Sequence, residues 1–543
     1  MGGHNGARGG RGAGPGGGRS HAGAQRRGQG RERGQGNQAG RRHPARAAHH
    51  RADGPGQRSG TRATDGGRTG GGTRRHEADP ARLVSLEALT RVREDGAYAN
   101  LVLPPLLDDA RLGRRDAGFA TALTYGTLRL RGRYDAIISR CVDRPLDKLD
   151  GVVLDVLRLG AHQLLGMRVA THGAVDATVS LAAHAAGRGA AGLVNAVLRR
   201  VADKDLASWL EEVTAEAPDA LAALSLTESH PLWVTRAMRQ ALRAHGREED
   251  ELAALLAADN TDPAVVLCAR PGLISPEQLA RQVEAATRTE PRPGDLSPYA
   301  LVMDGGDPGR VEAVRRSRAG VEDEGSQLVA LLLSEAPLEG RDENWLDLCA
   351  GPGGKAALLA ARAAQRGARL VTNEVSPHRA ALVRSAVRAV PEGVVEVRCE
   401  DGRDYGPAEP GRYDRVLVDA PCSGLGSLRR RPEARWRREA TDVTELAGLQ
   451  RELLTSALGA VRTGGLVAYV TCSPHLMETR LVVQDVMRRL ARQGHEVGLL
   501  HAGDVATRVA PVPPAGARDE MLQLWPHLDG TDAMFCALLR RTS

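Results

Sequence analysis

The sequence predicts a doubly wound α/β domain with a mostly parallel sheet, which follows an all-α domain and a small α/β connector. Over residues 341–543, apolar segments of strand length alternate with helical stretches, as is typical of a parallel sheet covered by helices. Residues 80–217 instead repeat apolar residues at helical spacing. A chain of 543 residues also exceeds what one hydrophobic core supports. We therefore expect a tail at 1–78 and domains at 79–217, 218–335 and 336–543.

The N-terminal tail is rich in arginine and glycine, and its composition predicts disorder. Residues 1–76 hold 24 of the 64 glycines and no Phe, Trp or Tyr, too little apolar surface to offset the entropy of ordering the chain. Sixteen arginines against three acidic residues give that stretch a formal charge of +13, so the total of +7 leaves −6 for the rest. Such a segment either contacts nucleic-acid phosphates or serves as a solubilising extension, and the composition is compatible with both.

The cysteines and the hydropathy indicate a reducing compartment. Seven cysteines are scattered without Cys-x-x-Cys spacing, which argues against a disulfide framework or a zinc site. No apolar run approaches the roughly 18 residues of a membrane span, and the first residues lack the apolar core of a secretory signal. We therefore expect a cytoplasmic protein that uses no metal and no membrane, and we expect a monomer.

The helical domain is expected to begin at Asp79. This residue is a good N-cap and Pro80 suits the first helical position, after which apolar residues recur on one face. Similar periodicity predicts helices at 116–131, 134–141, 155–165, 174–186 and 191–201. The pattern breaks around Pro231. The connector then carries β-like runs at 264–269 and 300–303, and a helix near 326–335 leads into the final domain.

The final domain is expected to contain six clear strands. Their apolar segments are 345–349, 369–373, 394–399, 415–419, 466–471 and 534–539, and long helices are expected at 355–366, 377–390 and 443–461. Sheets of this kind bind ligands beyond the carboxyl ends of their strands. The residues that follow each strand are therefore the candidates for function, and the last strand is expected to return antiparallel.

The first candidate motif is the glycine loop Asp347–Lys355, between the first strand and the first helix of this domain. Its glycines let the backbone approach a ligand, and the helix N-terminus offers unpaired N–H groups. Ala356 follows Lys355 where a phosphate-binding P-loop needs Ser or Thr, which excludes that class. The loop alone leaves a nicotinamide cofactor and S-adenosylmethionine equally open. Glu374 and Asp401 end the next two strands, where each is either a ligand of ribose or adenine or a solvated strand end.

Two cysteines follow neighbouring strands of the predicted sheet. Cys422 and Cys472 come just after the fourth and fifth strands and lie among Pro, Ser and Gly in turns. In contrast, Cys349, Cys399 and Cys536 lie within strands, where packing is the usual role. A thiol at the rim of such a sheet is well placed for nucleophilic chemistry. The alternative is a pair of incidental loop thiols.

A basic run follows the first of these cysteines. Residues 429–438 combine several arginines with one aromatic residue. As a loop that overhangs the substrate, this run would contact RNA phosphates and stack on a base. The candidate RNA-binding residues are Arg429, Arg430, Arg431, Arg435 and Trp436. The alternative is a solvated basic helix.

Together these motifs resemble the RNA cytosine-5 methyltransferases that have two active-site cysteines. The resemblance is carried by Asp347–Lys355, Asp419–Cys422, Thr471–Ser473 and the lead-in Asp323–Val329. The segments 192–200 and 229–233 resemble the bacterial small-subunit rRNA enzymes of this family, which join a domain like the antitermination factor NusB to the catalytic domain. The resemblance covers about residues 80–540. It implies a Rossmann-like S-adenosylmethionine methyltransferase domain behind a NusB-like RNA-binding domain, and 16S rRNA as the substrate.

The resemblance also implies roles for individual residues. Cys472 would attack C6 of the cytosine, Asp419 would hydrogen-bond the base, and Cys422 would assist removal of the C5 proton and release of the product. Lys355 would lie between cofactor and base, although its place on a helix also suits a solvent-facing lysine. The residues that would hold S-adenosylmethionine are Cys349, Ala350, Gly351, Pro352, Gly353, Gly354, Lys355, Glu374, Asp401 and Asp419.

Three positions depart from the family pattern. Gly351 stands where alanine is commoner, and we expect this change to be tolerated because it only removes a methyl group. Glu374 replaces a commoner aspartate and lengthens the reach to a ribose by one methylene. Residues 529–535 vary a more usual Asp-Gly-Phe-Phe, which leaves the C-terminal wall of the site undefined.

Other functions share part of this pattern. A nicotinamide-dependent dehydrogenase would use the loop and Glu374 but has no use for two cysteines at the rim. A DNA cytosine-5 methyltransferase would attack with Cys422, whereas Thr471–Ser473 favours the RNA class. A non-catalytic RNA-binding or antitermination factor would not need Cys472, Cys422 or Asp419, and all three are present. The sequence leaves open which cytosine is modified and whether free rRNA or an assembling subunit is the substrate.

Overall fold

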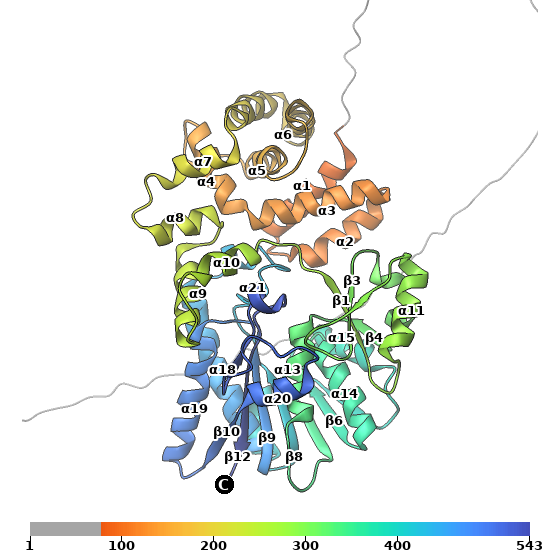
Figure 1. Ribbon diagram of the computed structural model, residues 1–543. Helices are drawn as coiled ribbons and strands as arrows, with labels where there is room; N and C mark the ends of the chain where they lie inside the picture. The colour runs from red at the N-terminus through yellow and green to blue at the C-terminus, as the bar shows by residue number, and fades with distance from the viewer. Residues whose placement is uncertain (1–77) are drawn as a thin grey trace, which may run out of the picture. The chain divides into compact units, whose positions relative to one another are not determined.

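The computed structural model describes residues 78–543 (Figure 1). The predicted disordered tail lies outside the described residues. Within them are a helical domain, a small four-stranded sheet and a large sheet of eight strands. The predicted fold class, an all-α region before a mostly parallel α/β sheet, is confirmed. Among these residues, none of the helices combines the length and the apolar character that a membrane span needs.

The helical domain begins where the sequence predicts it. Asp79 accepts a hydrogen bond from the backbone N–H of Arg82 at 3.0 Å, and Pro80 is the first residue of the first helix. The apolar faces of the helices meet in one core, which includes Leu89, Ile137 and Leu157. The helices are α1 (Pro80–Glu94), α2 (Ala99–Ala110), α3 (Arg114–Arg129), α4 (Arg131–Cys141), α5 (Gly151–Leu165), α6 (Thr171–Ala202) and α7 (Leu206–Thr214), with a short η1 (Leu146–Lys148).

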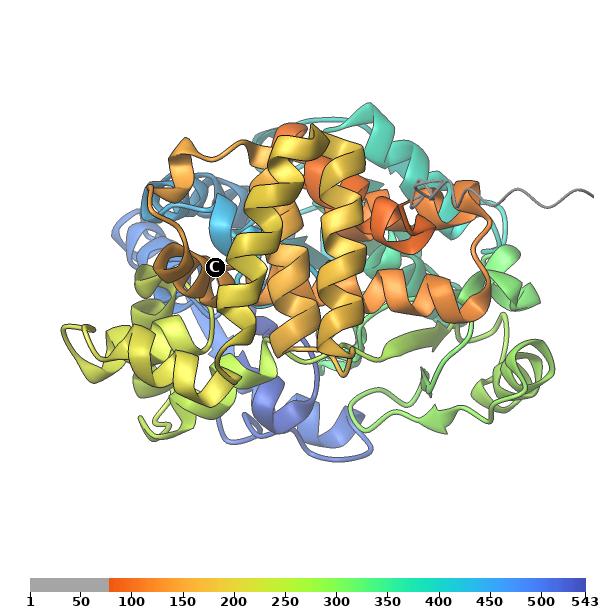
Figure 2. The ribbon, with the colours of Figure 1, turned by 90° about the horizontal axis from the view of Figure 1, so that it is seen from above.

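The long helix α6 is interrupted in the middle. Gly187 has a φ of 86° and a ψ of 176°, a conformation that glycine adopts at little cost. The predicted helices at 174–186 and 191–201 are the two halves on either side of this break. The halves lie side by side in both views of the ribbon (Figures 1 and 2).

Three further helices, α8 (Ala220–Thr227), α9 (Leu232–Ala244) and α10 (Glu251–Ala258), precede the first strand. The predicted break of the helical pattern at Pro231 is therefore local, because Pro231 occupies the N-cap of α9, where its missing N–H costs no hydrogen bond. In one apolar cluster, Met238 and Leu255 from these helices pack with Leu428 and Trp525 from the domain of the large sheet.

The small sheet is antiparallel, with strands in the order β2-β3-β1-β4. The predicted runs at 264–269 and 300–303 are its two central strands. Its elements are β1 (Val265–Ala269), α11 (Pro276–Thr287), β2 (Arg292–Pro293), β3 (Ala300–Met303), η2 (Pro308–Arg310), α12 (Glu312–Arg315) and β4 (Ala319–Val321). The chain then enters α13 (Glu324–Glu335), whose side chains belong to the core of the large sheet.

The large sheet has the order β10-β12-β9-β8-β5-β6-β7, and β11 pairs with β12. The five strands from β9 to β7 are parallel, whereas β12 is antiparallel to β9 and to β10. Its strands are β5 (Asn344–Asp347), β6 (Arg369–Asn373), β7 (Val395–Arg398), β8 (Tyr413–Asp419), β9 (Val461–Thr471), β10 (Val497–Leu500), β11 (Leu522–Gln523) and β12 (Phe535–Arg541). The expected antiparallel return of the last strand is confirmed.

Helices cover both faces of this sheet, as in Figure 1. One face packs on α13, α14 (Gly354–Arg366), α15 (Pro377–Val387) and α20 (Ala502–Val509). The other packs on α16 (Tyr405–Ala408), α18 (Ala440–Ala460) and α19 (Arg480–Arg492). Short elements lie in the loops: η3 (Gly402–Asp404), α17 (Ala434–Arg437), η4 (Leu476–Glu478) and α21 (Pro526–Asp529). Because five neighbouring strands are parallel, their carboxyl ends meet at one edge, where the predicted motifs lie.

Candidate active site

The glycine loop connects β5 to α14 with a backbone that side chains would obstruct. Gly353 has a φ of 117° at the N-cap of α14, and a Cβ on it would lie 2.7 Å from the Cβ of Ala386. A Cβ on Gly351 would lie 2.1 Å from Glu374 Oε2. Both glycines are therefore required by close neighbours, Glu374 directly after β6 and Ala386 in α15.

Glu374 is buried at the end of β6 and is held by the loop that it faces. Its Oε2 accepts a hydrogen bond from Gly351 N at 3.1 Å, and its Oε1 accepts one from Ser376 N at 3.0 Å. Arg379 lies 3.5 Å from the same carboxylate and donates to the carbonyl of Gly351. The structure therefore brings Glu374 to the glycine loop and gives Arg379 a supporting contact.

Asp347, the last residue of β5, is a fully buried carboxyl group under this loop. Neither of its oxygens has a hydrogen-bond partner among the described residues. Burial and the nearby charge of Asp419 raise the pKa of Asp347 to about 8. Buried carboxyl groups in proteins nearly always have a hydrogen-bond partner. Asp347 is therefore the residue near this loop that most clearly indicates a binding site for a polar ligand.

Lys355 and Asp419 form an ion pair between the loop and the end of β8. Lys355 Nζ donates to Asp419 Oδ2 at 3.0 Å and to Ser326 Oγ at 3.2 Å. The side chain of Lys355 is only 12% exposed, which rules out the solvent-facing alternative. Burial opposes its charge, but Asp419 and Glu322 outweigh burial and raise the pKa of Lys355.

The two cysteines face each other across the ends of β8 and β9. Their Sγ atoms are 3.3 Å apart, within hydrogen-bond reach for sulfur. The contact with Cys422 lowers the pKa of Cys472, burial and the charge of Asp419 raise it, and the charges of Lys355 and Arg431 lower it. The same contact, followed by burial, raises the pKa of Cys422. The opposite directions of the two shifts favour the proton on Cys422 rather than on Cys472.

Asp401 lies apart from this group, beyond the end of β7. Its carboxylate accepts the backbone N–H of Arg403 at 2.9 Å and pairs with the Arg403 guanidinium, which lowers its pKa. The side chain is 36% exposed. Asp401 is thus at a strand end, as predicted, but its charge is already paired by a neighbour in its own turn.

The basic run 429–438 differs most from its expected position. Arg435 is completely buried and donates to the carbonyls of Arg129, Ser229 and Asp259 and to the side chain of Asn260. Arg429 is 5% exposed. The prediction of a loop that overhangs the substrate is wrong for these two arginines, because the terminal nitrogens of each guanidinium donate to oxygens of distant segments.

Other members of the run are placed differently. Arg430 is partly buried and pairs with Asp323 at 2.6 Å. Arg431 is exposed, and its guanidinium lies 5.4 Å from the centre of the Tyr98 ring. Because its charge also lowers the pKa of Cys472, Arg431 is the arginine of this run that lies open to solvent near the thiols.

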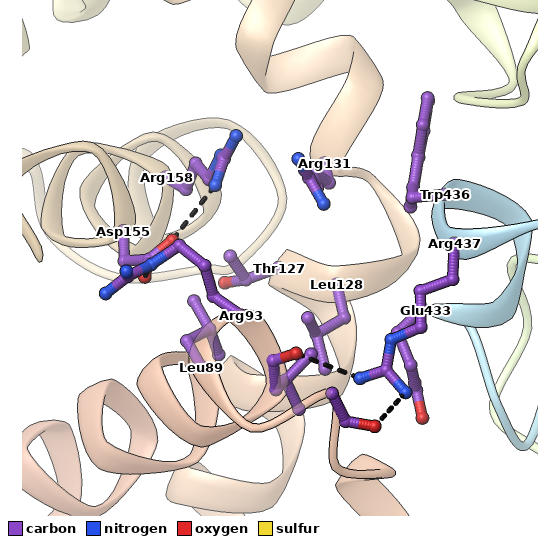
Figure 3. A pocket seen from close by; sticks show the side chains of 12 residues that line it. Leu89, Arg93, Thr127, Leu128, Arg131, Asp155, Arg158, Glu433, Trp436 and Arg437 are labelled. Atoms are coloured by element: carbon purple, nitrogen blue, oxygen red, sulfur yellow. Dashed lines mark hydrogen bonds and ion pairs between the residues drawn. The ribbon is translucent and has the colours of Figure 1, made fainter. Parts of the chain in front are cut away.

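Trp436 lies at a cleft between the helical domain and α17. The cleft has a volume of about 290 Å³ and is lined by Leu89, Val92, Arg93, Gly96, Thr127, Leu128, Arg131, Asp155, Arg158, Glu433, Trp436 and Arg437. Figure 3 shows Arg131 pointing into it, with Trp436 and Glu433 along one side. The Trp436 ring closely approaches Gly132, where a Cβ would lie 2.3 Å from it. Trp436 is therefore a contact between domains rather than a free stacking platform.

The comparisons with known proteins decide the family. Residues 336–540 match the profile of the family described as 16S rRNA methyltransferase RsmB/F, and residues 79–203 match that of the NusB family. A Mycobacterium tuberculosis protein that is provisionally named a methyltransferase is 49% identical over 87% of this chain and 98% of its own length. The chain belongs to the RsmB/F family of RNA cytosine methyltransferases.

One more sequence relative and one solved structure are similar to this RsmB/F protein. The ribosomal RNA small subunit methyltransferase B of Pseudomonas putida is 31% identical, over 75% of this chain and 89% of that protein. The crystal structure of the protein PH0851 superposes with a TM-score of 0.68 over 86% of this chain and 99% of its own, at 20% identity. The latter likeness concerns the fold alone.

S-Adenosylmethionine is the methyl donor of the RsmB/F family, and the residues around the glycine loop fit it. Two glycines of the loop have no room for a side chain, the Glu374 carboxylate lies against the loop, and Asp347 adds a buried carboxyl group without a hydrogen-bond partner among the described residues. The loop motif alone was compatible with a nicotinamide cofactor or with S-adenosylmethionine, and the family decides for S-adenosylmethionine.

The sequence analysis missed two buried carboxyl groups in this RsmB/F site. Glu322 precedes α13, and burial raises its pKa to about 7 although Lys355 opposes the shift. Glu478 lies in η4 behind both cysteines and is fully buried. Glu322 directly follows the short edge strand β4, and Glu478 lies seven residues after the end of β9. In the sequence, only their closeness to recognised motifs could have indicated them. Glu322 lies one residue before the segment Asp323–Val329, and Glu478 lies five residues after Ser473.

Proposed function

We propose that this protein transfers a methyl group to C5 of a cytosine in 16S rRNA, with Cys472 as the nucleophile, and that it acts as a cytoplasmic monomer. The observation that carries the proposal is the 3.3 Å contact between the Sγ atoms of Cys472 and Cys422 at the rim that holds the Lys355–Asp419 pair. The 16S rRNA target is supported by the name of the Pseudomonas putida relative.

Cytosine C5 is a poor nucleophile, so a group must first add to C6. The Cys472 thiolate forms a bond to C6, and the electron pair of the C5–C6 double bond moves towards C5 and the ring nitrogen N3. S-Adenosylmethionine, when bound at the glycine loop, supplies the methyl group that C5 takes up. The C5 proton then leaves, the C5–C6 double bond re-forms, and Cys472 departs as a thiolate.

Cys422 has two tasks in this proposal. In the free enzyme its S–H is proposed to donate to Cys472, 3.3 Å away, which favours the thiolate form of that residue. Once Cys472 is bonded to C6, the negative charge that holds the proton on Cys422 is gone. Cys422 can then release that proton to solvent, accept the C5 proton and allow elimination.

Asp419 and Lys355 hold the base and its developing charge. Asp419, paired with Lys355 and partly exposed, is proposed to accept a hydrogen bond from the exocyclic amine of the cytosine. The ammonium of Lys355, 3.0 Å from that carboxylate, fixes its orientation and offsets negative charge on the ring after attack.

The proposed cofactor site is the loop and the acids that follow it. The loop residues are Cys349, Ala350, Gly351, Pro352, Gly353, Gly354 and Lys355. Glu374 is proposed to bind the ribose hydroxyls, and Asp401 to reach the adenine amine while Arg403 holds it. Asp419 borders both the cofactor and the base.

For RNA binding, we propose Arg431 as the direct phosphate contact of the basic run. It is exposed and lies near the thiols, whereas Arg429 and Arg435 are buried. Arg430 and Trp436 are proposed to act beside it at the junction, and the NusB-like helical domain presents the rRNA.

Bisulfite mapping of 16S rRNA tests the function. A strain that lacks the gene should lose one 5-methylcytosine, and the intact gene should restore it. A gene that carries Cys472→Ala should not restore it. An unchanged map in the deletion strain would overturn 16S rRNA as the target.

A further inference from the structure

Glu478 is a buried carboxylate with no cation against it. Its side chain is completely inaccessible, and no Lys, Arg or His of residues 78–543 lies within 4.0 Å of it. Four donors approach its two oxygens instead: Ser423 N at 2.7 Å, Ser473 Oγ at 2.6 Å, Gln450 Nε2 at 3.3 Å and the hydroxyl of Ser423. Hydrogen bonds of this kind to a charged acceptor are the stronger class, and they offset the loss of hydration.

Three of these four donors come from the two cysteine loops. Ser423 directly follows Cys422, and Ser473 directly follows Cys472. The two serine hydroxyls are 3.3 Å apart, the same separation as the two thiols beside them. Glu478 is therefore the point at which the two loops are joined behind the sulfur atoms.

The sheet alone does not hold these loops in register. The ladder of β8 and β9 ends at Asp419 and Val470, with one further bond from Ala420 N to Val470 O. Beyond it the chain turns away, and only side chains and loop contacts can fix the relative position of the two thiols. One such contact is Gly426 N to Cys472 O at 2.9 Å.

The carboxylate is itself anchored from the rigid core. Tyr469 in β9 donates its hydroxyl to the carbonyl of Glu478 at 2.7 Å, and Gln450 in α18 donates to the carbonyl of Pro421 at 2.8 Å. Tyr469 and Gln450 also contact each other at 3.2 Å. A fixed carboxylate can therefore impose a fixed separation on the loops.

The charge of Glu478 acts unequally on the two thiols. It adds to the causes that raise the pKa of Cys422, after the contact with Cys472 and burial. On Cys472, the charges of Lys355 and Arg431 lower the pKa, and the charge of Asp419 raises it. The anion of Glu478 on the Cys422 side therefore adds to the preference for the proton on Cys422.

We propose that Glu478 is a positioning residue of the active site, which joins the two cysteine loops and thereby decides which thiol is the nucleophile. This inference rests on the proposed roles of Cys472 and Cys422. Glu478 does not touch the substrate in this proposal and acts through the serines next to each cysteine.

The test uses the full-length Glu478→Gln variant without RNA or cofactor. Glutamine has nearly the same size but removes the charge and turns an amide NH2 towards the serine hydroxyls. Iodoacetamide labelling from pH 6 to 10, followed by peptide mass spectrometry, measures each thiol separately. We expect wild-type Cys472 to react well below the pH at which Cys422 reacts. In Glu478→Gln this difference should shrink, with Cys472 labelling at pH 7 slowed about ten-fold, as one pKa unit implies.

Kinetics give a second measure. A positioning defect should lower kcat, on the order of 100-fold for a displacement of about 1 Å, and leave KM for RNA unchanged. Asp414→Asn is the matched control, because Asp414 is also a fully buried carboxylate on β8 but lies near the opposite end of the strand, where it holds Arg341 and Arg462. It should lower stability and leave the labelling difference of the thiols intact.

The outcomes separate this inference from the proposed function. Wild-type labelling of both thiols and a wild-type kcat in a folded Glu478→Gln protein would overturn it. If that variant does not fold, Ser473→Ala, which removes one donor, should change the labelling in the same direction, and an unchanged profile would again overturn it. Failure of the rRNA proposal would show in the bisulfite map while the RNA-free labelling result stood.

Discussion

Gly351 and Glu374 are fitted to each other in the glycine loop. Gly351 N donates to Glu374 Oε2 at 3.1 Å, and a methyl group on Gly351 would lie 2.1 Å from that same oxygen. The two positions depart together from the alanine and aspartate that are commoner in the family. The glycine fits here, as expected, and the structure adds the reason: the longer glutamate occupies the space that the methyl group would fill.

This fit predicts a compensating pair of substitutions. Gly351→Ala should weaken S-adenosylmethionine binding about ten-fold or more, since overpacking costs about 1–3 kcal/mol. Adding Glu374→Asp, which shortens the side chain by one methylene, should recover most of the affinity. Calorimetric titration of wild type, both single variants and the double variant gives the coupling. If the losses of binding free energy in the two single variants simply add in the double variant, the fit is contradicted.

The proposed division of labour between the thiols predicts opposite trapping results. After incubation with 16S rRNA and S-adenosylmethionine, Cys422→Ala should accumulate a covalent protein–RNA adduct, because attack proceeds and elimination does not. Cys472→Ala should form none. A mobility shift on denaturing gels measures the adduct, and the reverse pattern would reassign the nucleophile to Cys422.

Two arginines of the basic run should behave differently. Arg435→Ala should lower the free energy of unfolding by about 3–5 kcal/mol, since it leaves several buried acceptors without their donor. Arg431→Ala should leave stability unchanged and weaken RNA binding. It should also reduce the slope of the logarithm of the binding constant against the logarithm of the salt concentration by about one. Urea unfolding and binding titrations at several salt concentrations measure both. A stable Arg435→Ala protein would contradict the buried contact.

Asp347 predicts a pH-dependent stability. Burial and the charge of Asp419 raise its pKa to about 8 in the folded protein, from the ordinary value of 3.8 for an aspartate. The folded state therefore binds more protons between about pH 4 and pH 8, so this group's contribution to stability falls as the pH rises through that window, by up to about 1.4 kcal/mol per pH unit. Asp347→Asn should flatten the slope in urea unfolding from pH 5 to 8. Parallel slopes in the two proteins would contradict the raised pKa.

Local patterns account for what the sequence determined. Apolar periodicity and turn residues predicted the helix that begins at Pro80, the strand before the glycine loop and the strands before the two cysteines, because each depends on neighbours in the chain. A short strand such as β10, which is only half-buried along its length, lacks that signal and was not predicted.

Only the tertiary structure decided which charged residues are buried and what they hold. Arg435 donates to the carbonyl of Arg129, and Glu433 accepts a hydrogen bond from the backbone of Ala99. Both partners lie more than 300 residues away in the sequence. A run of arginines therefore has the same local sequence whether it faces water or a carbonyl. Glu478 and the fit of Gly351 to Glu374 likewise depend on which segments meet in space. The sequence by itself thus determined the fold class and the motifs at the strand ends, whereas the folded chain decided their packing partners, because burial depends on contacts that local sequence does not encode.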